Sequence, residues 1–257
     1  MHQRHSTDEK SVVKTLFFAL GNKTMIPIRD TAPCNHRPIM TWIIIMLCTT
    51  IFVVMQWILP DNVSYQAINQ FGMVAVRYSN PQWARDFGLP PDYGFSFISN
   101  LFFHADWSHL LANMWFLWIF GDNVEDRMGR WRFLLFYLWC GALATFLQWY
   151  FDPALVIPVI GASGAIAGVL AAYFFLYPLE QVIVWIPFIF PILLPIPAIA
   201  FLGLWIMLQL HNATEAVFFT HAAANVAWWA HLGGFLAGCL SYRWFLNSKS
   251  VDTDSLI

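Results

Sequence analysis

Charged residues are scarce in this 257-residue chain. Lysine, arginine, aspartate and glutamate make up 11% of the residues, and the net charge is −2. Soluble domains carry about 25% charged residues, so this chain lacks the charge to cover a water-exposed surface in the usual way. A net charge this small also gives no reason to expect nucleic acid as a partner. The composition favours a protein whose surroundings are the lipid bilayer.

Disulfide and metal-binding patterns are also missing. The chain has four cysteines, no two of them form a C-x-x-C pair, and three lie inside apolar runs. We therefore expect small buried thiols and no disulfide framework. The zinc motif H-E-x-x-H is absent, and so is a pair of intramembrane aspartates suited to acid proteolysis. We expect no metal and no other cofactor.

Long apolar runs are abundant, and hydrophobic residues make up 59% of the chain. A membrane-spanning helix needs roughly 20 mostly apolar residues. We predict an all-α polytopic membrane protein with six transmembrane helices in one bundle. Residues 1–38 are predicted as a cytosolic N-terminal tail, 39–246 as the six-helix core and 247–257 as a short cytosolic C-terminal tail. The predicted helices are 39–59, 101 or 108 to 120, 133–151, 163–177, 197–210 and 226–246.

Three connections between these helices have a distinct composition. Residues 60–100 are rich in aromatic side chains, which favours a loop lying at the membrane interface. Residues 121–132 are predicted as a polar turn. Residues 182–196 contain or border four prolines, and because proline cannot sit in a regular helix, we predict an irregular membrane-associated segment there.

The positive charges are unevenly distributed across this topology. Eleven of the 13 lysines and arginines lie on the side of the two termini, and Arg77 and Arg85 lie on the other. Cytoplasmic loops carry the excess of positive charge, so we expect both termini in the cytosol. The expected location is the bacterial inner (plasma) membrane.

Four polar side chains lie near the outer ends of the predicted helices, where polar groups are costly and usually functional. Serine is a poor nucleophile until a base, usually histidine, takes its proton, so we predict Ser163 as nucleophile and His231 as base. His109 and Asn113 stand at i and i+4 on one helix face. With the backbone N–H of Ser163 they can form an oxyanion hole. The sequence offers no acidic third member, so we predict a Ser-His dyad.

Glycines accompany both of these catalytic candidates. Gly164 and Gly168 form one small-xxx-small face, Gly234 and Gly238 form another, and Gly161 precedes the serine. Small faces let two helices approach closely. We expect this packing to bring the serine and histidine helices together.

Taken together, these motifs resemble the rhomboid family of intramembrane serine proteases, over about residues 39–246. The resemblance implies cleavage of transmembrane protein substrates within or near the membrane, with lipids as the other partners. It implies the same roles for the serine, the histidines and the asparagine, and a lateral gate formed by the fifth helix and residues 211–225. The matching residues are His109-Leu-Leu-Ala-Asn113, Gly161-Ala-Ser163-Gly164 with Gly168, Ala230-His231 with Gly234 and Gly238, and Phe120-Gly-Asp-Asn-Val-Glu125 with Gly129.

The chain departs from the family at two places. Many members have a Trp-Arg pair where this chain has Phe95-Ser96, so the anchoring of the 60–100 loop is expected to differ. Some members place an aromatic residue one turn after the serine, where this chain has Ala167.

Two other functions fit parts of the pattern. One is a catalytically silent rhomboid-like protein that binds membrane clients, although such proteins usually lack the serine or the histidine. The other is a transporter that uses His109 and His231 as proton relays. The lack of intramembrane carboxylates and of an inverted repeat counts against it.

Overall fold

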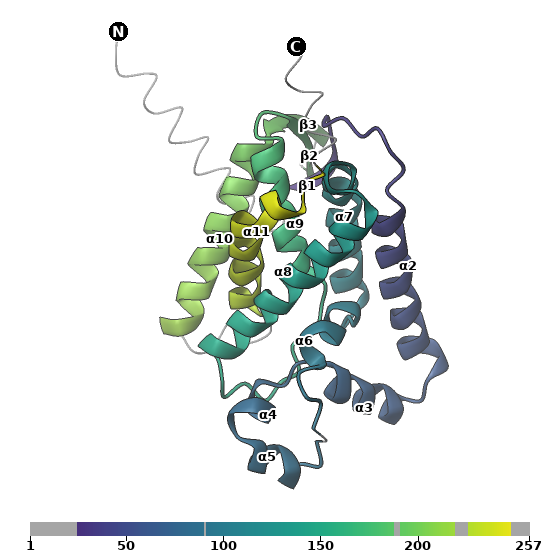
Figure 1. Ribbon diagram of the computed structural model, residues 1–257, viewed down its shortest axis with the longest axis vertical. Coiled ribbons are helices and arrows are strands. Elements are labelled where there is room, and N and C mark those ends of the chain that lie inside the picture. The colour runs from purple at the N-terminus through teal and green to yellow at the C-terminus, as the bar shows by residue number, and fades with distance from the viewer. Residues whose placement is uncertain (1–24, 90, 188–190, 219–225, 248–257) are drawn as a thin grey trace.

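The computed structural model describes residues 25–89, 91–187, 191–218 and 226–247, and within this part the chain is mostly helical with one small sheet. Figure 1 shows long helices running between two ends, with the sheet at one end and short helices at the other. The tails at 1–24 and 248–257 lie outside the described residues. The long helices are α2 (Ile39–Val53), α7 (Trp107–Met128), α8 (Arg130–Phe151), α9 (Ser163–Leu176), α10 (Ala198–Phe218) and α11 (Trp228–Phe245).

Two of these helices, among the described residues, are long and apolar enough to cross a membrane. One is α2 with its π-helical continuation Val54–Ile58, a 20-residue stretch of mean hydropathy 2.2. The other is α8, with 22 residues and a mean hydropathy of 1.4. Helix α9 is apolar but shorter. Length and composition alone therefore support two spans, and the predicted six remain a prediction.

The polar tract 121–132 is largely helical, so the predicted turn is wrong. Helix α7 continues through it to Met128 and ends at Gly129, whose φ of +79° suits glycine. The reason is the buried carboxylate of Glu125, which accepts hydrogen bonds from the backbone N–H groups of Met40 and Thr41 at 2.9 and 2.7 Å. The first N–H groups of a helix have no partner within it. The polar residues of α7 thus cap the start of α2.

The sheet corrects three predictions at once. Strands β1 (Ile26–Asp30), β2 (Gln181–Pro187) and β3 (Pro191–Pro197) form an antiparallel sheet in the order β1-β2-β3. The fold is therefore not all-α. Residues 182–187 and 191–196 pair as antiparallel strands, where an irregular segment was predicted, and residues 26–30 are part of the folded unit instead of a tail. Pro191, Pro195 and Pro197 are tolerated because β3 is an edge strand, where an N–H is not needed on the outer side. Pro187 ends the central strand β2, beyond the residues that pair with β1.

The C-terminal helices differ from their predicted limits. Helix α10 begins at Ala198, directly after β3, and extends well beyond the predicted end at residue 210. Helix α11 is slightly shorter than the predicted 226–246. Of the predicted gate loop 211–225, residues 211–218 belong to α10, and residues 219–225 lie outside the described part of the chain.

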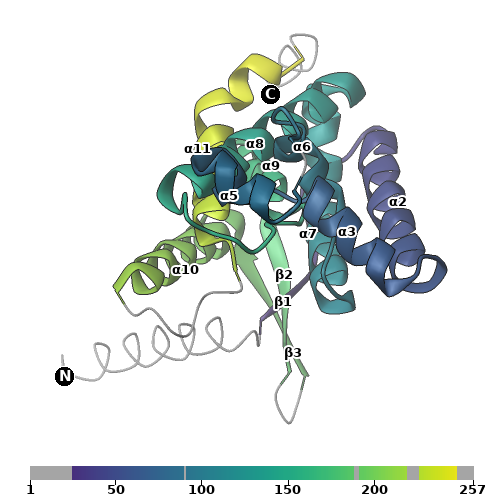
Figure 2. The same cartoon turned by 90° about the horizontal axis from the view of Figure 1, so that it is seen from below.

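The long 60–100 connection folds into short helices below the bundle (Figure 2). They gather at the end opposite to the sheet, beneath α7 and α8 (Figure 1). The segment is thus structured instead of being a simple loop. Its helices are α3 (Asp61–Phe71), α4 (Ala75–Ser79), α5 (Pro81–Asp86) and α6 (Ser96–Ser99).

A buried carboxylate anchors this connection where the sequence departs from the family. Asp92 accepts hydrogen bonds from Arg77 at 3.0 Å, from the Tyr78 hydroxyl at 2.6 Å and from the Ser96 backbone at 3.1 Å. Burial alone would raise the pKa of Asp92, but these hydrogen bonds and the neighbouring guanidinium outweigh it and hold the pKa below its ordinary value. Phe95 itself points outward and is 58% exposed.

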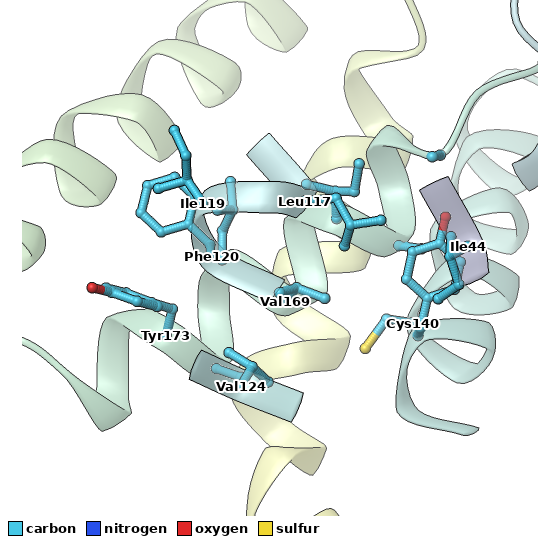
Figure 3. Packing of buried hydrophobic residues seen from close by; sticks show 14 of the residues in the cluster. Ile44, Leu117, Ile119, Phe120, Val124, Cys140, Val169 and Tyr173 are labelled. Atoms are coloured by element: carbon cyan, nitrogen blue, oxygen red, sulfur yellow. The ribbon is translucent and has the colours of Figure 1, made fainter. Parts of the chain in front are cut away.

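Helix α9 occupies the centre of the bundle. Every residue from Gly164 to Tyr173 is buried, and Figure 3 shows Val169 and Tyr173 among the core side chains of its neighbours. The Tyr173 ring packs edge-to-face against Phe120 of α7, with centroids 5.0 Å apart. Helix α9 has 14 residues, is roughly 21 Å long, and packs against the longer helices α7, α8, α10 and α11.

Candidate active site

Ser163 and His231 meet at the start of α9. Ser163 is the first residue of that helix, and His231 lies in the first turn of α11. The Oγ of Ser163 and the Nε2 of His231 are 2.9 Å apart. The start of α11 is held in place by Gln148 of α8, whose side-chain oxygen accepts a hydrogen bond from the Ala230 N–H at 3.2 Å.

The two helices approach until their backbones touch. A Cβ at Gly234 would overlap the carbonyl of Gly164, and one at Gly238 would overlap the carbonyl of Gly168. Gly168 also faces α8, where a Cβ would overlap the side chain of Cys140. This proximity allows a serine and a histidine, both with short side chains, to form a hydrogen bond between helices.

The turn into α9 lies directly against α7. Gly161 has a φ of +126°, which only glycine adopts readily, and its N–H donates to the Asn100 carbonyl at 2.9 Å. A Cβ there would stand 2.5 Å from the Nε2 of His109 and 3.6 Å from the Nδ2 of Asn113. Glycine, two residues before Ser163, therefore makes room for both side chains.

Asn113 is available to donate a hydrogen bond. Its side chain is buried, and its Nδ2 finds no hydrogen-bond partner among the described residues. A buried unpaired donor costs about 1–3 kcal/mol. Since the first N–H groups of α9 also lack intrahelical partners and carry the positive end of its dipole, a negative oxygen beside Ser163 would meet several donors.

The start of α7 is fixed by its own cap. The carboxylate of Asp106 accepts a hydrogen bond from the His109 N–H at 2.9 Å and from the Ser108 hydroxyl at 2.6 Å. The ring of His104 lies 5.1 Å from the His109 ring. Burial lowers the pKa of His104 to about 3, so this ring is neutral beside the site.

Sequence reasoning missed one side chain at the site, Gln209 of α10. Its Oε1 lies 2.8 Å from the Nδ1 of His231, the ring nitrogen that faces away from Ser163. An amide can bind a histidine ring nitrogen as an acid does, but glutamine is too common a residue to mark a site by type alone. The available signal was a polar side chain in the apolar run of α10, where such groups are costly.

Aromatic rings surround the histidine, although Ala167 of α9 supplies none. The Trp205 ring of α10 lies 6.2 Å from the His231 ring at an angle of 37°. The Trp228 ring of α11 lies 5.9 Å away, nearly perpendicular. The aromatic contact that some rhomboids place one turn after the serine thus comes from other elements.

No group of three or more histidine, cysteine, aspartate or glutamate side chains lies close enough to hold a metal ion within the described ranges. The site consists of a hydroxyl, imidazoles and amides. These groups suit proton transfer and the stabilisation of an oxyanion.

The chain matches known proteins over most of this region. A Rhomboid domain model matches residues 91–248. Rhomboid protein 1, mitochondrial, of Saccharomyces cerevisiae is 32% identical over 161 residues, which are 61% of this chain and 43% of that protein. Presenilin-associated rhomboid-like protein A, mitochondrial, of Danio rerio is 32% identical over 149 residues, 55% of this chain and 35% of that protein.

A plant relative extends the comparison. Rhomboid-like protein 11, chloroplastic, of Arabidopsis thaliana is 40% identical over 77 residues, which are 30% of this chain and 27% of that protein. The matched region thus spans less than half the length of each of these three relatives.

The relatives overturn the predicted location. All three are named for a mitochondrion or a chloroplast. The expectation of a bacterial inner membrane, with both termini in the cytosol, is therefore corrected. An excess of positive charge on one side of a membrane protein does not identify which membrane the protein spans.

Proposed function

We propose that this chain is a serine endopeptidase acting on transmembrane proteins. The premise is its family, since the chain belongs to the rhomboid family. Family membership supports a protease-like function within a membrane. The observation that carries the finer proposal is the 2.9 Å contact between the Oγ of Ser163 and the Nε2 of His231. This is the distance at which a histidine can take the proton of an attacking serine.

In the proposed reaction, the Ser163 hydroxyl attacks the scissile carbonyl carbon while its proton passes to His231. The new C–O bond places a negative charge on the carbonyl oxygen. The N–H of Ser163 and the side chains of His109 and Asn113 stabilise that oxyanion, and one such donor is worth about 3 kcal/mol. The imidazolium then gives its proton to the leaving amine as the C–N bond breaks. Water hydrolyses the acyl-enzyme by the same proton transfers in reverse order.

We propose that α2, α7, α8, α9, α10 and α11 are the six membrane spans, in one core that runs from β1 to about residue 246. Five of these helices present large apolar side chains outward, as expected for surfaces that face lipid. Helix α9 packs among the others, and its length of roughly 21 Å is less than the roughly 30 Å thickness of the hydrocarbon core. Outward side chains, 55–67% exposed, are Met46, Trp118, Leu135, Met207 and Leu240.

The proposed substrates are transmembrane proteins, and membership of the rhomboid family supports this substrate class. The relatives' names support an organellar inner membrane as the compartment. Carbonate extraction of organelle fractions after expression of a tagged chain would check this placement. Recovery of the chain in soluble fractions would contradict it.

The test uses purified full-length protein in liposomes with a fluorogenic transmembrane substrate. Ser163→Ala should abolish cleavage and labelling by a serine-directed fluorophosphonate. Ser241→Ala is the matched control, because the Ser241 hydroxyl donates to the Ala237 carbonyl of its own helix at 2.6 Å. That variant should cleave and label as the unmodified chain does.

Undiminished cleavage by Ser163→Ala would sink the mechanism. If the unmodified chain binds transmembrane clients but neither cleaves nor takes the label, the client-binding alternative holds instead. Solute uptake by Ser163→Ala liposomes would favour a transporter.

A further inference from the structure

Gln209 of α10 contacts the ring of His231 on the side opposite to Ser163. We propose that Gln209 is a positioning residue, an inference that rests on the proposed function. It holds His231 in the tautomer whose Nδ1 carries the proton, so that Nε2 is free to accept the proton of Ser163.

Both nitrogens of the His231 ring are engaged in one line of hydrogen bonds. Nδ1 lies 2.8 Å from the Oε1 of Gln209, and Nε2 lies 2.9 Å from the Oγ of Ser163. Gln209 is 8% exposed, so water has little access to its amide. A neutral imidazole has one donor nitrogen and one acceptor nitrogen. Whichever group binds one nitrogen therefore decides what the other can do.

The orientation of the amide is set by a second contact. The Nε2 of Gln209 lies 3.4 Å from the backbone carbonyl of Trp205, to which it can donate. With the amide turned over, its oxygen would face that carbonyl, and two acceptors would repel each other. The oxygen of Gln209 is thus directed at His231, and because it can only accept, Nδ1 must carry the hydrogen.

Helix α10 supports the ring with two groups from one face. Trp205 and Gln209 are four residues apart and so lie one above the other on the helix. The Trp205 ring packs beside the imidazole, while Gln209 binds its Nδ1. Packing restricts the tilt of the ring, and the hydrogen bond restricts its rotation. Together they select one orientation of the base.

Gln209 takes the place that an acid has in a catalytic triad. It orients the ring in the same way, but it adds no negative charge to stabilise an imidazolium. Across the described part of the chain, no carboxylate makes a hydrogen bond or an ion pair with His231. The titratable group facing it from a neighbouring helix is His109 of α7. Within the described residues, no negative side chain therefore stabilises the protonated form of His231.

The first test compares two substitutions in the full-length protein in liposomes. Gln209→Leu keeps the approximate volume but removes the acceptor, and kcat should fall about 10- to 100-fold with KM within about threefold, since general-base catalysis contributes 10²–10⁴. Gln209→Glu keeps an acceptor and should restore most of kcat. It should also move the acidic limb of the kcat/KM profile to higher pH, because a carboxylate favours the protonated imidazole.

A matched control is available in Gln56→Leu, which exchanges the same residue types at an exposed position of the π-helical turn. It should leave kcat and the pH profile unchanged. A purely structural role for Gln209 predicts instead that Gln209→Glu is as damaged as Gln209→Leu, with no shift of the profile.

The second test does not depend on proteolysis. Nitrogen-15 NMR of histidine-labelled protein, with His231→Ala to assign the signal, reports which ring nitrogen bears the hydrogen. We expect a protonated Nδ1 in the unmodified chain and mixed tautomers in Gln209→Leu. A hydrogen on Nε2 in the unmodified chain, or unchanged spectra in Gln209→Leu, would overturn the inference.

The two proposals fail in different ways. If Ser163→Ala is inactive while Gln209→Leu matches the unmodified chain in kcat and tautomer, the function stands and the inference is wrong. If Ser163→Ala cleaves normally while the tautomer of His231 still follows Gln209, the proposed function is wrong and the inference on the ring stands.

Discussion

Helix α11 meets its neighbours α9 and α10 in two different ways. Toward α9 the backbones touch, and a Cβ at Gly234 would overlap the carbonyl of Gly164. Toward α10 the contact to the base runs through side chains, from the Oε1 of Gln209 to the Nδ1 of His231 at 2.8 Å. Helix α10 is also more loosely packed against α9, because a Cβ at Gly203 would find its nearest neighbour, the ring of Phe174 of α9, at 3.9 Å. The proposed nucleophile and base thus lie across the closest helix contact. Gln209 reaches the base with a long side chain.

This difference follows from what each contact must supply. A serine and a histidine form a direct hydrogen bond only if their helices nearly touch, and close-packed interiors transmit small displacements. An amide on a longer side chain tolerates a wider separation. We therefore expect substitutions at the α9–α11 contact to cause large losses of activity. A substitution at Gly203 of α10, where an added Cβ has room, should cause little loss.

The largest effect is expected from Gly234→Ala. Its methyl group would coincide with the Gly164 carbonyl, so the helices must separate and the Ser-His hydrogen bond must break. Overpacking typically costs 1–3 kcal/mol, and more where backbone must move. Cleavage should fall below detection, and the melting temperature of the detergent-solubilised protein should drop. Activity near that of the unmodified chain would show that the contact is not as close as described.

Asn113→Ala should come next. It removes the unpaired buried donor beside Gly161 and leaves the α9–α11 contact intact. We expect kcat to fall about 100-fold at unchanged melting temperature, because one oxyanion donor is worth about 3 kcal/mol. A change in KM alone, with kcat preserved, would assign Asn113 to substrate binding instead.

Acid should affect the 60–100 connection before the α9–α11 contact, because the connection depends on an ionised carboxylate. The folded-state pKa of Asp92 is lowered, so its stabilising contribution is complete above its ordinary pKa of about 3.9 and is lost as the pH falls further. Limited proteolysis of residues 60–100 should therefore increase below about pH 4. Asp92→Asn should increase it by a smaller factor at neutral pH and remove the pH dependence.

The smallest effect is expected from Gly203→Ala, the counterpart of Gly234→Ala. The site is helical and open, so the added methyl group fits and alanine favours the helix by up to about 1 kcal/mol. Melting temperature and kcat should remain within error or rise slightly. A loss comparable to that of Gly234→Ala would show that α10 packs against α9 as closely as α11 does.

Parts of the fold followed from local sequence, and parts did not. The apolar runs predicted α8 and α9 within about three residues, because each is apolar throughout and ends at a polar or proline-containing break. The pairing of β1 with β2 was not predictable, because Ile26 and Trp185 are far apart in the chain. The polar end of α7 was predicted as a turn because its partner, the start of α2, is visible only in three dimensions.

The sequence by itself determined the membrane class and the family, since composition and ordered motifs are properties of the chain. It also proposed Ser163, His231, His109 and Asn113 by residue type and helix position. The tertiary structure decided the sheet, the cap on α2 and the contact of Gln209 with His231. A glutamine can pair with many groups, and only the packing of α10 against α11 selects this one.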